Sequence, residues 1–196
     1  MVRKGIYIVT SFEESDENIP FGDVCGISSR LKKVILTEAP ITESLLKKRV
    51  ANSYGIMRIG SIVDALLDEG IALLSGDEEI TAVDECGERT FHKKGEEDVF
   101  RPTPDEPEKT RYSYQIPPSE GELVLEYIAL DGKSWTKKAL SESFKVELGY
   151  KKKGSQVEKL FLKSLQLAME SGKLTRLGNG RIKTNQTEED INADQP

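Results

Sequence analysis

The chain has few of the residues from which metal sites, disulfides and catalytic triads are usually built. Its 196 residues include one histidine, His92, and two cysteines, Cys25 and Cys86. Two cysteines cannot form a disulfide framework, and a lone histidine does not supply the ligands of a zinc site. Because a nucleophile, a base and an orienting group cannot be assembled around a single histidine, we expect a non-enzymatic protein that needs no metal or cofactor.

The sequence also has no long apolar run and no secretory signal. A membrane-spanning helix needs about 20 consecutive apolar residues, so we expect no membrane segment. With so few cysteines, this favours a cytoplasmic protein.

Two short motifs resemble chemical sites without meeting their requirements. Gly132-Lys133-Ser134 resembles the end of a phosphate-binding loop, but Tyr127 stands where that loop needs another glycine. Asp105, Glu108 and Lys109 resemble a nuclease motif, but they lie within one proline-rich run and cannot flank a metal from separate strands. We interpret the second motif as part of a linker.

The clearest positive feature is an internal repeat. Residues Gly55–Ser61 return as Gly149–Ser155, at an offset of 94 residues, and both segments begin with glycine and end with Gly-Ser. At that offset Leu31–Val83 aligns without a gap on Leu125–Leu177, with apolar positions meeting apolar positions almost throughout. Two copies of one packed unit produce this pattern.

Each copy is expected to hold three helices and a β-hairpin, the order of a winged helix-turn-helix. The fold class is therefore mainly α with small β-hairpins, α+β, as a tandem winged helix-turn-helix. For the first unit we expect a helix capped by Ser28 or Ser29 and stopped by Pro40, a helix from Thr42 to Gly55, a helix opening at Gly60-Ser61, and a hairpin over residues 80–93. For the second unit we expect a helix over Glu122–Leu130 capped by Ser119, a helix from Thr136 to Gly149, a helix opening at Ser155, and a hairpin over residues 173–183.

Outside the units, composition predicts an arm, a linker and a tail. Arg101–Lys109 is rich in proline and charge, so we expect an extended, stiff linker, and the arm holds one strand at Gly5–Thr10 of uncertain partner. The last residues are poor in apolar side chains and are expected to be disordered. The expected parts are an N-terminal arm (1–26), the first winged-helix unit (27–96), a proline-rich linker (97–117), the second winged-helix unit (118–185) and an acidic tail (186–196).

The net charge of −6 conceals a basic second unit. Residues 130–185 hold thirteen Lys and Arg against five Asp and Glu, whereas residues 1–129 hold fifteen against twenty-five. The net charge of the whole chain argues against a nucleic-acid partner. The positive charge of the second unit, however, is compatible with one.

Basic residues of the second unit gather on the elements that contact DNA in a helix-turn-helix, the start of the third helix and the wing. Lysines there hold phosphates, whereas Gln156 is suited to contact a base edge. The candidate nucleic-acid-binding residues are Lys151, Lys152, Lys153, Ser155, Gln156, Lys159, Lys173, Arg176, Arg181 and Lys183. The alternative is that these lysines simply solvate a helix face.

The first unit carries a different surface at the matching positions. Its third helix and wing are rich in Asp and Glu, which repel phosphate. Ile56, Met57, Arg58 and Ile59 instead form a candidate protein-docking patch.

Three segments resemble a known family: Glu38–Ile41, Gly55–Ser61 and Ile116–Glu120. Residues 7–184 are similar to a C-terminal domain of unknown function in large bacterial helicase-like proteins of superfamily I. That resemblance implies a DNA-processing context, although no motor or nuclease is present in this chain. It supplies no catalytic residues.

We therefore expect a nucleic-acid-binding module in a helicase- or nuclease-associated context, in which the second unit contacts DNA phosphates and the first docks a protein. The alternative is an adaptor that docks on a helicase-like partner without touching DNA. A transcriptional regulator is a weaker third interpretation.

Overall fold

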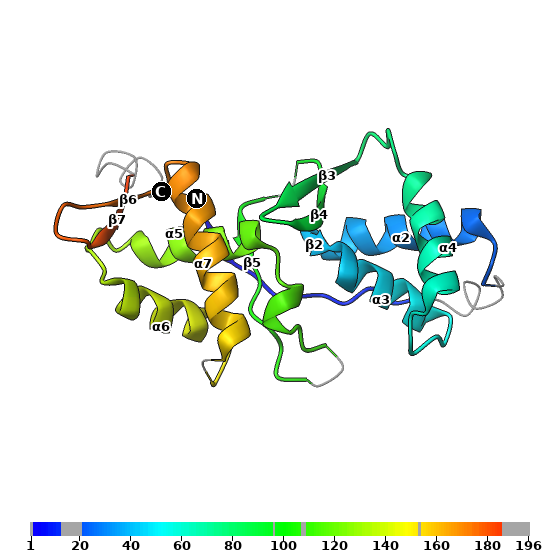
Figure 1. Cartoon of the computed structure of the whole chain (residues 1–196), viewed down its shortest axis with the longest axis horizontal. Coiled ribbons are helices and arrows are strands. Elements are labelled where there is room, and N and C mark those ends of the chain that lie inside the picture. Colours follow the sequence, from blue (N-terminus) through cyan, green and yellow to red (C-terminus); the bar gives the residue numbers. More distant parts are fainter. Residues whose placement is uncertain (1, 13–20, 96, 107–108, 153, 186–196) are drawn as a thin grey trace. The chain divides into compact units, whose positions relative to one another are not determined.

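The computed structural model describes residues 2–12, 21–95, 97–106, 109–152 and 154–185. The chain forms two compact units. We call Ile8–Glu96 the first unit, and Met1–Tyr7 together with Glu97–Pro196 the second unit. Each has its own hydrophobic core, and helices with short strands build both, so the mixed α+β class is confirmed (Figure 1).

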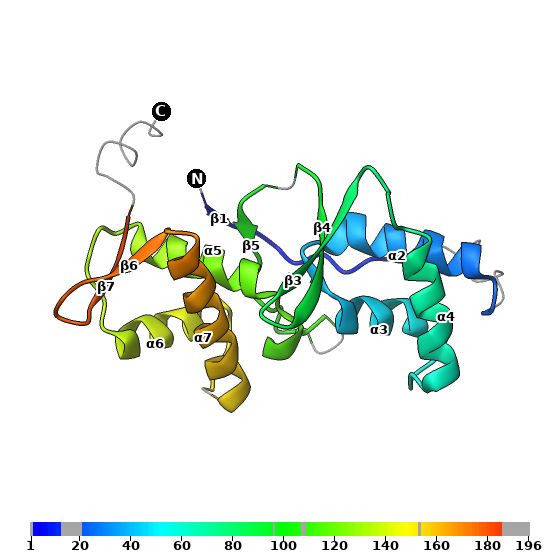
Figure 2. The ribbon, with the colours of Figure 1, turned by 45° about the horizontal axis from the view of Figure 1, so that its top comes forward.

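In its described residues, the first unit contains three helices packed beside a small sheet. Strand β2 pairs with β4, and β4 pairs with β3, all antiparallel. Cys86 and Gly87 both have positive φ between β3 and β4, which is the two-residue turn expected of a tight hairpin (Figure 2). In chain order the elements are α2 (Val24–Glu38), β2 (Ile41–Thr42), α3 (Glu43–Ser53), α4 (Ser61–Ala72), β3 (Ile80–Glu85) and β4 (Glu88–Lys93).

The second unit repeats this order and adds elements before it. The parallel pair of β1 (Arg3–Lys4) and β5 (Val99–Phe100) and the 3₁₀ turn η1 (Ser113–Gln115) come first. They are followed by α5 (Pro118–Ala129), α6 (Lys137–Glu147), α7 (Ser155–Glu170), β6 (Leu174–Arg176) and β7 (Ile182–Thr184).

The sequence repeat is reproduced element by element. Helices α5, α6 and α7 and strands β6 and β7 each begin 94 residues after α2, α3, α4, β3 and β4. Thr42 and Thr136 cap α3 and α6, and Gly55 and Gly149 follow those helices with positive φ, as predicted. A backbone bridge between Trp135 and Ile182 occupies the place of β2.

The starts of the first helices were predicted wrongly. Helix α2 begins earlier than expected, because the Asp23 side chain, and not Ser28 or Ser29, accepts from the Cys25 N–H. Helix α5 also begins earlier, with Pro117 at the N-cap and Pro118 inside, so Ser119 lies in the first turn. Proline suits that position because the first-turn N–H groups have no partner within the helix.

The arm and linker also differ from expectation. The strand in the arm is Arg3–Lys4, not Gly5–Thr10, and its partner is β5. Of the expected linker 97–117, Phe100, Arg101 and Arg111 are buried in the second unit. The buried Glu120 carboxylate binds both arginines, and the proline content of the segment does not predict this contact. The expected tail, 186–196, lies outside the described residues.

Candidate nucleic-acid interface

Helix α7 presents a polar and basic face to solvent. Gln156 and Lys159 are exposed and Lys163 is half-buried, at a spacing of three and then four residues that places them on one side of the helix. Val157, Leu160 and Phe161 fill the core on the other side. The core residues therefore fix which side chains point outward.

The N-terminus of α7 is open. Its N-cap is Gly154, which has no side chain to accept from the first-turn N–H groups, and Ser155 and Gln156 beside it are exposed. Free N–H groups at a helix start favour an anion. Together with the lysines, this is the arrangement expected for holding a phosphate.

The loop before α7 carries further positive charge. Lys151 and Lys152 are exposed, whereas Lys153 lies outside the described residues. Lys151 Nζ lies 3.4 Å from Asp105 Oδ1, but both side chains are more than four-fifths exposed, so this pair is weak.

The hairpin contributes fewer free cations than the sequence predicted. Lys173 lies 3.1 Å from Glu126 and 3.7 Å from Glu122. Burial opposes its charge, but the two carboxylates outweigh burial and raise its pKa. Lys173 is therefore paired with carboxylates of the second unit, and its contact with DNA stays a prediction.

Arg181 is also engaged within the second unit, because its Nε and Nη2 donate to the Ser134 carbonyl at 3.1 and 2.6 Å. It holds the loop before α6 against the hairpin. Arg176 and Lys183 remain exposed, and neither has an ion-pair partner among the described residues.

The first unit has a different surface at the equivalent positions, 94 residues earlier. Met57 and Ile62 are 81% and 78% exposed, and Arg58 and Ile59 are exposed beside them, whereas Ile56 packs against the core. On the three positions that form the polar face of α7, helix α4 carries Ile62, Ala65 and Glu69 in place of Gln156, Lys159 and Lys163.

The contact between the second and third helices also differs. In the first unit Lys47 Nζ lies 2.7 Å from both Asp64 and Asp68, and these carboxylates with Glu43 overcome burial and raise the pKa of Lys47. In the second unit the equivalent pair is Ser141 and Glu158, joined by a 3.0 Å hydrogen bond. The lysine of the first unit is thus neutralised between helices.

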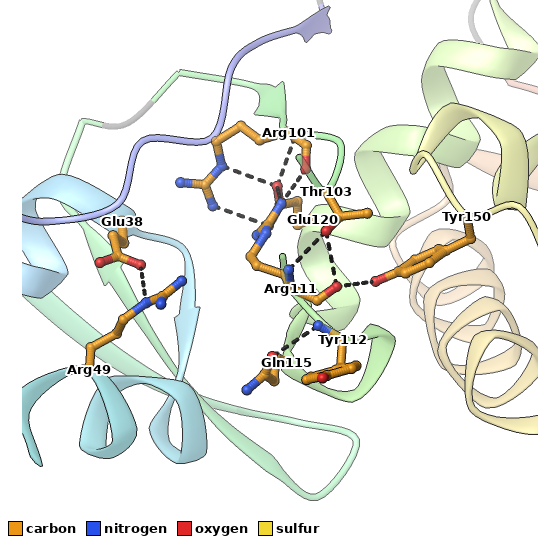
Figure 3. A network of polar contacts seen from close by, with 9 residues as sticks. All are labelled: Glu38, Arg49, Arg101, Thr103, Arg111, Tyr112, Gln115, Glu120 and Tyr150. Carbon is orange, nitrogen blue, oxygen red and sulfur yellow. Dashed lines mark hydrogen bonds and ion pairs between the residues drawn. The ribbon is translucent and has the colours of Figure 1, made fainter. Parts of the chain in front are cut away.

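A buried ionic cluster holds the segment of the second unit that precedes α5 (Figure 3). Glu120 is fully buried, and its carboxylate lies 2.6 and 2.9 Å from Arg111 and 3.1 Å from Arg101. Glu120 Oε1 also accepts from the Arg101 backbone N–H at 2.8 Å. Burial alone raises the pKa of Glu120, but the two guanidinium groups outweigh it and lower the pKa to about 2. Glu120 is therefore ionised at neutral pH, where it binds the two arginines and cannot act as a proton donor.

The cluster connects directly to the loop before α7. The centroid of the Tyr7 ring lies 4.0 Å from the Arg111 guanidinium carbon. The Tyr150 hydroxyl donates to the Arg111 carbonyl at 2.9 Å (Figure 3). Burial raises the pKa of Tyr150, so its phenol stays protonated and donating.

Two sets of residues were missed from the sequence. Lys163 follows Lys159 at i+4, so helical spacing was a sufficient signal for it. The Glu120 cluster left no such signal, because its arginines lie in a segment whose composition predicts a linker.

Comparisons with models of protein families, with curated proteins and with solved structures find no match to this chain. Within the described residues, no group of three or more His, Cys, Asp and Glu side chains is placed to hold a metal. None of the helices described is long and apolar enough to cross a membrane.

Proposed function

We propose that both units are winged helix-turn-helix units and that the second binds duplex DNA through α7 and the loop before it. The element order in each unit and the pairing of β2 with the hairpin support this assignment. In such units the third helix enters the major groove by its N-terminal residues. The resemblance to a helicase-associated domain adds a DNA-processing context. The module is non-enzymatic and cytoplasmic in this proposal.

One observation carries the proposal most: equivalent positions on the outward side of the third helix differ in character between the two units. Gln156, Lys159 and Lys163 suit phosphates and a base edge. If these positions were ordinary solvent-exposed surface in both units, the first unit would not be expected to carry Ile62, Ala65 and Glu69 there. We therefore assign the two faces to different partners.

The first unit, in this proposal, docks a protein. Met57, Ile59 and Ile62 form an exposed apolar patch beside Arg58. A groove of about 400 Å³ includes Ile59 and is lined by charged side chains of both signs: Glu43, Asp64, Glu88, Lys47 and Arg89. The exposed apolar side chains favour a partner segment that is itself apolar. This patch is also the main observation in favour of a pure adaptor.

The test is duplex binding by the full chain with both α7 lysines removed. Lys159→Ala with Lys163→Ala should weaken binding about equally for all duplex sequences, because phosphate contacts carry no sequence information. The matched control is Glu69→Ala in the first unit, which should leave the affinity unchanged. If the wild-type chain binds no duplex at low salt, the adaptor replaces the DNA-binding module.

A further inference from the structure

Two exposed tyrosines of the second unit are stacked on each other. The rings of Tyr112 and Tyr114 have centroids 5.5 Å apart and planes only 3° apart. They are 54% and 53% exposed, so much of their apolar surface faces solvent. Large flat aromatic surfaces left open in this way are suited to stack another planar group.

The pair is held in place by its backbone. The Tyr112 N–H donates to Gln115 Oε1 at 2.9 Å, and the Gln115 N–H donates to the Tyr112 carbonyl at 2.8 Å. Gln115 is buried, and Arg111, the residue before Tyr112, is clamped by Glu120. The rings are therefore presented by a fixed segment, which lowers the entropic cost of binding.

The segment that carries the tyrosine pair contacts the elements that form the candidate DNA interface. Turn η1, which holds Tyr114, packs against α7. The segment before the pair contacts the loop that leads into α7, because the Tyr150 hydroxyl donates to the Arg111 carbonyl at 2.9 Å. Through Arg111 and Tyr150, the aromatic platform is thus joined to the loop that carries Lys151 and Lys152.

We infer that Tyr112 and Tyr114 stack an unpaired nucleobase of a single strand that continues from the duplex held at α7. Aromatic rings stack on any base, and neighbouring lysines hold the backbone of either a duplex or a single strand. The preferred ligand is then a duplex with an unpaired tail. This inference rests on the proposed function and specifies its substrate class.

The experiment compares the affinity of the full chain for three DNAs: a blunt duplex, the same duplex with an unpaired tail, and the tailed duplex with abasic tail nucleotides. Stacking of one base should tighten binding of the normal tail about fivefold or more over the blunt duplex. The abasic tail should lose most of this gain, because only a base can stack. Tyr112→Ala with Tyr114→Ala should abolish the gain while keeping the blunt-duplex affinity, whereas Tyr112→Phe with Tyr114→Phe should retain it.

Several outcomes overturn the inference. If the duplex with a normal tail binds no more tightly than the duplex with an abasic tail, no base is stacked on the tyrosines. If the double alanine variant still prefers the tailed duplex, the unpaired base binds elsewhere. If the tyrosine pair binds a proline-rich peptide and not the tail, it is a protein-binding site. These results leave blunt-duplex binding intact and so spare the proposed function, whereas a wild-type chain that binds no blunt duplex at low salt overturns both.

Discussion

At the scale of single residues, both units need a glycine where the first and third helices cross, but they place it on different helices. Where the first and third helices cross, the first unit pairs Ile27 with Gly70, and a Cβ on Gly70 would lie 2.7 Å from Ile27. The equivalent pair in the second unit is Gly121 and Ser164, with the small residue on the other helix. Because glycine lets two backbones approach closely, each crossing needs only one of its two residues to be glycine.

The position of the glycine predicts that Ser164→Gly compensates for the loss of stability caused by Gly121→Ala. A Cβ on Gly121 would lie 2.0 Å from Ser164 Oγ and 3.2 Å from the Phe144 ring. Gly121→Ala should therefore destabilise the second unit by about 1–3 kcal/mol in urea unfolding, despite alanine's better helix propensity. Adding Ser164→Gly should recover most of the loss. A double variant no more stable than Gly121→Ala would contradict this account of the crossing.

Glu120 predicts how stability depends on pH. Its pKa is lowered from 4.5 to about 2 in the folded protein, so its contribution is complete above the unfolded value and is lost as pH falls from about 4.5 toward 2. That contribution is on the order of 3 kcal/mol. Glu120→Gln should lower the free energy of unfolding at pH 7 by about 3–5 kcal/mol, because two buried guanidinium groups lose their partner.

The same variant should also flatten the fall in stability across this acidic window. The control is Glu106→Gln, which alters an exposed carboxylate and should leave the pH profile of urea unfolding unchanged. An equally steep profile in Glu120→Gln and in the wild type would show that the cluster does not supply the dependence.

At the scale of elements, the sequence predicted most of what repeats. Apolar spacing located the helices, and the capping threonines and terminal glycines located α3 and α6. Helix starts failed where serine was favoured as the cap, because Asp23 caps α2 and proline begins α5. Local propensity cannot separate several polar residues that compete for one cap.

The candidate site was predictable only in part. Lys159 and Gln156 lie on an exposed helix face as expected. Lys173 and Arg181 do not remain free, since their partners, Glu126 and Ser134, come from parts of the chain far away in sequence. Charge counting records how many cations an element carries, but tertiary contacts decide which of them face solvent.

At the scale of the whole molecule, the division of charge between the units matters more than the total. The acidic first unit holds its buried lysine between carboxylates and exposes apolar side chains. The second unit exposes lysines around an uncapped helix start. In the proposed function, one duplicated architecture serves two partners, because surface side chains can change while the core pattern is kept.

The salt dependence of duplex binding by the full chain tests this assignment most directly. Each lost phosphate contact lowers the slope of log K against log salt by about 0.9. Changing Lys151, Lys152 and Lys153 together to Ala should therefore flatten the slope by about two to three units. The equivalent triple change of Met57, Arg58 and Ile59 to Ala should leave it unaltered. No duplex binding at low salt, or an equal loss of slope in both variants, would contradict the account.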